Sequence, residues 1–198
     1  MPPLGRRRRH DGWIATLLLI NGPPGVGKST LARRYVDDHP LALLLEIDGI
    51  RTSLGRWQEV ERSRLVARDL ATAMAAAHLR AGHDVVVPQY LGRTGFIESL
   101  EALAGRAEAS FCELHLLDAE ATVFDRFRAR RRSLAAAGED HPQTDLADDA
   151  VAGAVADALR RLRAVRSERP GTIVIDAAAG TEAAYAQLRQ ALEDIDTA

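Results

Sequence analysis

Short apolar runs alternate with longer amphipathic stretches along the whole chain. The short runs have the length and composition of strands that are buried on both faces. They occupy residues 17–21, 41–47, 84–88, 111–117 and 172–176. The longer stretches repeat apolar residues at helical spacing. They predict helices at residues 28–38, 58–81, 94–104, 119–136, 145–167 and 181–193. Strands that alternate with helices form a parallel sheet covered on both faces, so the pattern predicts an α/β fold.

The length of the chain favours a single folded domain. Its 198 residues, 46% of them hydrophobic, suit one core. We expect residues 1–13, which include four consecutive arginines, to form a solvated tail; a phosphate- or RNA-binding arm is the alternative. Residues 14–198 then form the domain. The one long polar break, at residues 135–146, follows an arginine cluster and indicates a lid at about 126–146.

A glycine-rich octapeptide follows the first predicted strand and opens the first predicted helix. It fits the pattern G-x-x-x-x-G-K-[ST] of a phosphate-binding P-loop. Its residues are Gly22, Pro23, Pro24, Gly25, Val26, Gly27, Lys28 and Ser29, and Thr30 follows in the helix. A strand before the loop and a helix N-terminus after it are the context that this motif requires, because the helix dipole attracts phosphate. The alternative is a glycine-rich turn that contains a lysine by chance. The flanks favour nucleotide binding.

Lys28 is the only lysine among 26 basic residues, and all the others are arginine. A compact ammonium group fits between the β- and γ-phosphates of a nucleotide, where a flat guanidinium would be too large. The glycines let backbone N–H groups turn towards the phosphates. The hydroxyl of Ser29 is then placed to bind Mg²⁺. The chain is therefore expected to bind a nucleoside triphosphate.

Asp48 and Arg51 follow the second predicted strand. Substrates of such sheets bind at the carboxyl ends of the strands, so Asp48 is expected near the γ-phosphate. A carboxylate there can accept the proton of an attacking hydroxyl, and Arg51 can hold an anionic group. The alternative is that Asp48 caps a helix and that Arg51 lies on the surface.

Arg126 and Arg130 are four residues apart on a predicted helix and share one face of it. Their place before the polar break suits a lid that closes over the phosphates and stabilises charge during transfer. A solvated basic helix face is the alternative.

The third predicted strand ends without an acidic residue, at Pro88 and Gln89. A motor-type ATPase needs a Walker B acid there, so its absence argues against an enzyme that activates water. Gln89, Tyr90 and Arg93 are instead interpreted as lining an acceptor pocket. A simple exit from strand to turn would look the same.

These motifs resemble those of the P-loop small-molecule kinases, whose members include chloramphenicol phosphotransferase, the zeta toxins and tunicamycin-resistance-type proteins. The similar segments are G-P-P-G-V-G-K-S-T, a strand that ends in I-D-G-I-R, and R-x-x-x-R before a lid. The resemblance implies strand order 2-3-1-4-5, Mg-ATP as donor, and a hydroxyl acceptor such as an antibiotic or nucleoside. It also implies that Asp48 is the base and that Arg126 and Arg130 are lid arginines. Because no acid follows the third strand, Asp48 is expected to serve Mg²⁺ together with Ser29.

The overall composition excludes several classes of partner. A net charge of −2 and a pI of about 6.3 give no general attraction to nucleic acid or membranes. No apolar stretch approaches the roughly 20 residues needed to span a bilayer. The single cysteine, Cys112, cannot form an internal disulfide and fits a reducing cytoplasm. The six histidines lack metal-ligand spacing.

We therefore expect an ATP-dependent phosphotransferase that acts on a hydroxyl of a small molecule, as a monomer or homodimer. Two alternatives stay open. One is a polynucleotide 5′-kinase, supported only by the basic tail. The other is a nucleotide-dependent regulatory module with little turnover.

Overall fold

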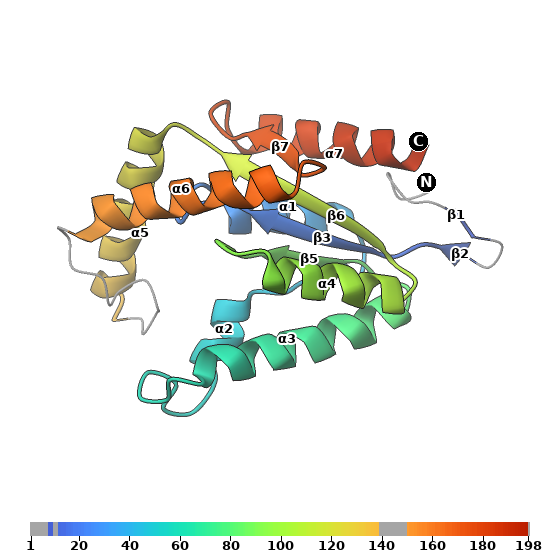
Figure 1. Ribbon diagram of the computed structural model, residues 1–198, viewed down its shortest axis with the longest axis horizontal. Coiled ribbons are helices and arrows are strands. Elements are labelled where there is room, and N and C mark those ends of the chain that lie inside the picture. Colours follow the sequence, from blue (N-terminus) through green and yellow to red (C-terminus); the bar gives the residue numbers. More distant parts are fainter. Residues whose placement is uncertain (1–7, 10–11, 139–149, 198) are drawn as a thin grey trace.

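A five-stranded parallel sheet forms the centre of the protein (Figure 1). The computed structural model describes residues 8–9, 12–138 and 150–197. The strands are β3 (Thr16–Asn21), β4 (Leu43–Leu44), β5 (Val85–Pro88), β6 (Ser110–Leu117) and β7 (Ile173–Asp176). They lie in the order β4-β5-β3-β6-β7. Numbered along the chain, this is the order 2-3-1-4-5, so the predicted fold class and strand order are confirmed.

The central strand β3 is buried along its whole length because it has a neighbour on each side. Leu17 lies opposite Val85 of β5 and Phe111 of β6. Successive side chains of a strand point to opposite faces of the sheet, so β3 supplies both halves of the core. Leu18 and Ile20 pack on one side, and Leu17 and Leu19 on the other.

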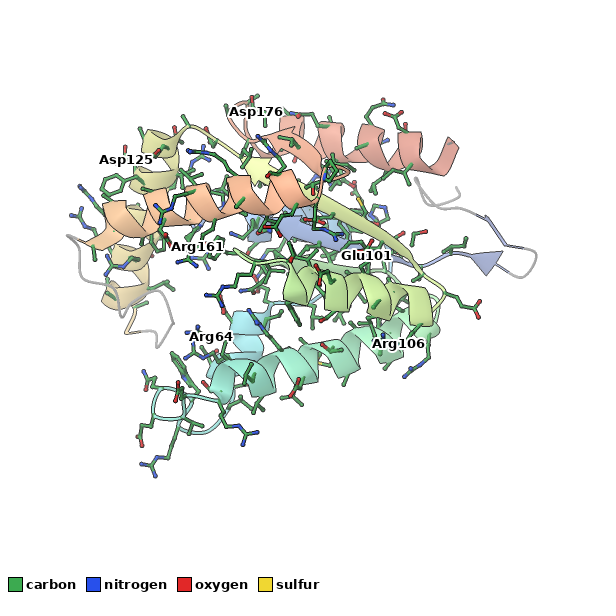
Figure 2. The ribbon with its side chains drawn as sticks, in the orientation of Figure 1. Arg64, Glu101, Arg106, Asp125, Arg161 and Asp176 are labelled. Atoms are coloured by element: carbon green, nitrogen blue, oxygen red, sulfur yellow. The ribbon has the colours of Figure 1, made fainter. Side chains whose placement is uncertain are left out.

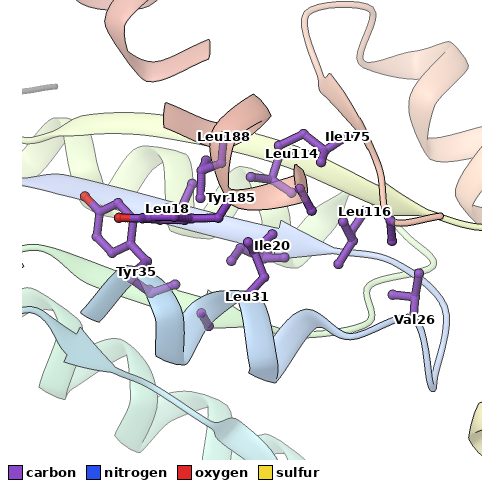
Figure 3. Packing of buried hydrophobic residues seen from close by; sticks show 14 of the residues in the cluster. Leu18, Ile20, Val26, Leu31, Tyr35, Leu114, Leu116, Ile175, Tyr185 and Leu188 are labelled. Atoms are coloured by element: carbon purple, nitrogen blue, oxygen red, sulfur yellow. The ribbon is translucent and has the colours of Figure 1, made fainter. Parts of the chain in front are cut away.

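The helices cover these two faces as separate layers (Figure 1). On the face of Leu18, the core includes side chains of α1 (Lys28–Asp38) and α7 (Thr181–Thr197), and Figure 3 shows Leu31 and Leu188 packed there. On the face of Leu17, it includes α3 (Ser63–Arg80) and α4 (Gly95–Arg106). Two more helices, α5 (Glu120–Ala136) and α6 (Val151–Glu168), pack against each other. In Figure 1, α5 stands beyond the carboxyl end of the sheet.

The second strand is much shorter than predicted. The apolar run 41–47 was expected to be one strand, but only Leu43–Leu44 pair with β5. The run begins at Leu41, which has φ of 66° and is 70% exposed. It ends in a short helix, α2 (Ile47–Thr52). Since β4 is an edge strand with one neighbour, few backbone hydrogen bonds oppose this early change of direction.

Other boundaries differ by a few residues, as is usual where helix ends fray. The long helix predicted at 58–81 begins at Ser63 after a series of turns, and the last helix continues to Thr197 instead of residue 193. The helix predicted at 145–167 corresponds to α6, which covers Val151–Glu168. Its predicted start, residue 145, falls among residues 139–149, which lie outside the described part of the chain. The same gap contains the end of the predicted lid.

The amino-terminal segment includes a short antiparallel pair, β1 (Arg8–Arg9) and β2 (Gly12–Trp13). Arg6 and Arg7 of the arginine run lie outside the described residues. A solvated tail that ends at residue 13 stays a prediction.

Cys112 on β6 is 4% exposed and is a free thiol. Burial, together with the neighbouring charge of Glu113, raises the pKa of this thiol to about 12.

In residues 12–138 and 150–197, no helix is both long and apolar enough to cross a bilayer.

Candidate active site

A cavity of about 540 Å³ opens at the carboxyl ends of the strands. Its walls come from the P-loop, α1, α2, the exit of β5, α5, and the turn between β7 and α7. The polar or charged side chains that line it belong to Lys28, Ser29, Thr30, Glu46, Asp48, Gln89, Tyr90, Arg126, Arg130 and Thr181. Ligands of open α/β sheets bind at this edge, so the cavity is the candidate active site.

The P-loop is held in place by close contact between its backbone and neighbouring elements. Gly25 has φ of 83°, a conformation that favours glycine. A Cβ atom at this position would lie 2.8 Å from the backbone nitrogen of Phe127 and 2.9 Å from the carbonyl oxygen of Val123, both in α5. The loop and α5 can approach each other this closely only because position 25 has no side chain.

The first turn of α1 presents its backbone N–H groups to the cavity. The helix begins at Lys28, and the residue before it is Gly27, which has no side chain that could cap those groups. Pro24, Gly25, Val26, Ser29 and Thr30 line the cavity as well. Uncapped N–H groups at a helix N-terminus bind phosphate, so this wall suits a nucleotide.

The side chain of Lys28 bends back along the loop. Its Nζ donates to the carbonyl oxygens of Gly22, at 3.0 Å, and Pro23, at 2.9 Å. Burial, and next the positive charge of Arg130, lower the pKa of Lys28 to about 7, although the negative charge of Asp48 opposes the shift. The basic residues Lys28, Arg126 and Arg130 line the cavity together with two acidic residues, Glu46 and Asp48, which favours an anionic ligand.

Asn21 fixes the start of the P-loop to the exit of β5. Its Oδ1 accepts from the N–H of Gly22, at 2.8 Å, and of Leu91, at 2.9 Å. Its Nδ2 donates to the carbonyl oxygen of Leu91, at 3.0 Å. Asn21 was predicted only as the last residue of a strand, with no role in the site. An Asn at the end of an apolar run was the signal that could have indicated one, because a buried amide needs hydrogen-bond partners; Asn21 is fully buried.

Asp48 lines the cavity from the first turn of α2, not from the end of a strand. Burial lowers the pKa of Lys28 and of Arg68 in α3, and the negative charge of Asp48 partly opposes both shifts. Glu46, the N-cap residue of α2, also lines the cavity and pairs with Arg33 of α1 at 3.1 Å. Glu46 was not among the residues predicted for the site.

The two arginines of α5 both line the cavity, opposite α2. Arg126 forms an ion pair of 2.9 Å with Asp118, whose side chain is only 3% exposed. Asp118 also accepts from the N–H of Ala119, at the start of the same helix. This buried carboxylate therefore holds Arg126 towards the first turn of α5.

The residues predicted for the acceptor pocket divide into two groups. Gln89 and Tyr90 line the cavity, and burial raises the pKa of Tyr90. Arg51 and Arg93 are not among the lining residues. The Nε of Arg51 donates to Ser63 Oγ at 3.0 Å, and its guanidinium lies 4.7 Å from the ring centre of Trp57.

The turn between β7 and α7 completes the cavity with Ala177, Gly180 and Thr181. Ala177 and Gly180 carry no polar side-chain group, so their side chains mark no chemical role in the sequence.

Oxygen donors suited to magnesium are few. Ser29 and Asp48 line the same cavity and offer the hard oxygen ligands that Mg²⁺ prefers. Within the part of the chain that the structure describes, no three His, Cys, Asp or Glu residues are grouped to hold a metal ion. These residues fit an ion that takes most of its ligands from nucleotide phosphates and water.

Comparison with known sequences agrees with this site. A family described as "AAA domain" matches residues 17–147, more than half of the chain. An adenylate kinase from Synechococcus sp. (strain WH7803) is 32% identical over 127 residues, covering 59% of this chain and 69% of the relative.

Solved structures share the fold at lower identity. A gluconokinase from Sinorhizobium meliloti 1021 has a TM-score of 0.59 and 16% identity, with 93% of this chain and 95% of the gluconokinase covered. A tunicamycin resistance protein from Deinococcus radiodurans has a TM-score of 0.57 and 20% identity, with coverage of 91% and 95%. From its P-loop, its strand order and the family match together, the chain belongs to the AAA domain family and to the P-loop small-molecule kinases.

Proposed function

We propose that this protein transfers the γ-phosphoryl group of ATP to a hydroxyl of a small molecule, with Mg²⁺ as cofactor. The observation that carries the proposal is the charge arrangement in one cavity, where Asp48 and Arg130 both act on Lys28. A motor ATPase would place its acid at the end of β5, and that position holds Pro88 and Gln89.

Each charged group has a separate part in the proposed reaction. Lys28 and the N–H groups of the P-loop hold the β- and γ-phosphates. Ser29 and Asp48 would help to hold Mg²⁺ at these phosphates, and the ion would reduce the negative charge of the phosphates. The acceptor hydroxyl gives its proton to Asp48 as its oxygen attacks the γ-phosphorus. The new O–P bond forms, the bond from phosphorus to the β–γ bridging oxygen breaks, and ADP leaves. Arg126 and Arg130 stabilise the charge on the transferred group.

Acceptor-dependent ADP release tests this proposal. The rate should rise when a hydroxyl compound is added, and the added phosphate should be found on that compound. Antibiotics, nucleosides and sugar acids belong in the first panel, because the relatives include a tunicamycin resistance protein and a gluconokinase. Steady ADP release without any acceptor would instead identify a simple ATPase and refute the proposal.

A carboxamide at position 48 tests the role of the base. Asp48→Asn should lower the transfer rate by about 10²- to 10⁴-fold and leave ATP affinity nearly unchanged. Asp37→Asn is the matched control, since Asp37 is an exposed residue of α1 that does not line the cavity. Transfer at the normal rate in Asp48→Asn would show that Asp48 is not the base.

The proposed setting is the cytoplasm. It rests on Cys112, a buried free thiol that has no second cysteine in the chain to pair with.

A further inference from the structure

A second cavity, of about 230 Å³, is separate from the candidate active site. Its walls come from the end of β6, the start of α5 and the second half of α6. Three leucines supply its apolar surface, and its other lining residues are polar or charged. The lining residues are His115, Leu117, Asp118, Glu120, Leu159, Leu162, Arg163 and Arg166, and none of them lines the first cavity. Sites for drug-sized ligands have roughly 300–1,000 Å³, so this cavity suits a smaller molecule.

The charged groups at the edge of this cavity come from both helices. Among the described residues, Arg163 and Arg166 of α6 and Glu120 of α5 are exposed and form no ion pair. By contrast, Arg161 of α6, which Figure 2 labels, is paired with Asp157 at 2.6 Å. The cavity therefore offers two free positive charges on one wall and a free negative charge on another. This arrangement favours a ligand that carries charges of both signs.

Two lining residues also contact residues of the active site. The Nδ2 of Asn21 donates to the Nε2 of His115 at 3.3 Å, and Asn21 fixes the start of the P-loop. Asp118 forms the ion pair with Arg126, which lines the first cavity. A ligand in the second cavity would thus contact a residue that holds the P-loop and a residue that holds α5.

We infer that the second cavity binds an amino acid with an apolar side chain, and that this ligand changes nucleotide affinity through His115 and Asp118. The carboxylate of the ligand pairs with Arg163 and Arg166, because guanidinium groups match both oxygens of a carboxylate. Its ammonium group pairs with Glu120, and its side chain packs on the three leucines. This binding site goes beyond the proposed function and requires no transfer reaction.

Matched ligands test the charge requirement. L-leucine is compared with 4-methylpentanoate, which lacks the ammonium group, and with 3-methylbutylamine, which lacks the carboxylate. Binding is measured without nucleotide, from the rise in Tm with ligand concentration. Leucine should bind about tenfold more tightly than either analogue, since each analogue loses a charged partner. Equal binding of one analogue would overturn the amino-acid class. No rise in Tm with leucine, valine or phenylalanine would overturn the site itself.

Substitutions on both helices test the assigned contacts. Arg163→Gln and Arg166→Gln should each raise the Kd of leucine about tenfold. Arg160→Gln is the control, because Arg160 is an exposed residue of the same helix that pairs with Asp157 and does not line the cavity. Glu120→Gln should weaken the binding of leucine but not that of 4-methylpentanoate. The same Kd for leucine in all these variants would overturn the assigned contacts.

The link to the active site is measured by calorimetry. The Kd of ADP should differ by about fivefold or more with and without saturating leucine, and ADP should change the Kd of leucine by the same factor, because such coupling is reciprocal. Arg166→Gln should lose this effect at the same leucine concentration. Equal ADP affinity with and without leucine would overturn the link, even if leucine binds. None of these measurements needs an acceptor, so failure of the proposed function would leave this site standing.

Discussion

Nucleotide binding should be accompanied by proton uptake, because Lys28 has a pKa of about 7 in the free site. At pH 8 about a tenth of the Lys28 side chains are then protonated, compared with about half at pH 7. Phosphate oxygens beside the amine favour the charged form and raise its pKa again. Binding at pH 8 should thus take up about 0.9 proton, and at pH 6 only about 0.1.

The same linkage sets the pH dependence of affinity. Below pH 7 the lysine is already charged, so affinity should change little. Above pH 7 each unit of pH should raise the Kd about tenfold, and charging the lysine should cost about 1.4 kcal/mol at pH 8. This trend should continue until the pKa of the nucleotide-bound lysine is reached. Above pH 7 the nucleotide itself contributes little, since a phosphate monoester has its second pKa at about 6; at pH 6 the difference in proton uptake between the wild type and Lys28→Met gives the part that belongs to Lys28.

Calorimetry in two buffers of different ionisation enthalpy measures the proton uptake directly. ADP or a non-hydrolysable ATP analogue is titrated at pH 6, 7 and 8. Lys28→Met is the control, because methionine has no group that titrates in this range. Uptake near zero at pH 8 in the wild type, or equal uptake in Lys28→Met, would refute the reasoning.

Three further substitutions test other parts of the site. Gly25→Ala should lower the free energy of unfolding by about 1–3 kcal/mol, because a Cβ there meets the backbone of α5, and it should weaken nucleotide binding. Thermal unfolding measures the change in stability. Gly105→Ala in α4 is the control, since the space there is open and stability should not fall. Asp118→Asn should lower kcat roughly fivefold at unchanged nucleotide Kd, since Arg126 loses a charged partner; an unchanged kcat would remove its positioning role. Asn21→Leu should cost about 2–6 kcal/mol in urea unfolding, because two buried N–H groups lose their acceptor, and a cost below about 1 kcal/mol would contradict this account.

The features that local rules determine could be predicted from the sequence. The strand, the glycine loop and the helix around Lys28 follow from neighbouring residues alone, because the motif and its flanks are contiguous. The sheet order also agreed, since the family resemblance implied it and right-handed connections permit few alternatives. Arg126 and Arg130 could be placed on one side of a helix because a spacing of four puts two side chains on the same face, and both line the cavity; their role in a lid stays a prediction.

Features that depend on tertiary contacts could not be predicted. An apolar run does not show that its strand lies at the edge of the sheet, so the early start of α2 was missed. Arg51 was expected to line the site, but it does not line the cavity. Its guanidinium lies over the ring of Trp57, in the loop after α2, and its spacing from Asp48 does not show this contact. The role of Asn21 depends on a residue 70 positions away, and no local pattern encodes that hydrogen bond.

The buried thiol of Cys112 has a practical consequence for observing any motion of α5. With a pKa of about 12 and 4% exposure, it offers almost no thiolate to a maleimide dye at neutral pH. The chain contains no other cysteine, so cysteines introduced on exposed positions of α5 and α3 would be labelled without removing a native one. A fluorophore pair on these two helices would report the distance across the cavity in single molecules. A change in this distance when nucleotide or acceptor binds would test whether α5 acts as a lid.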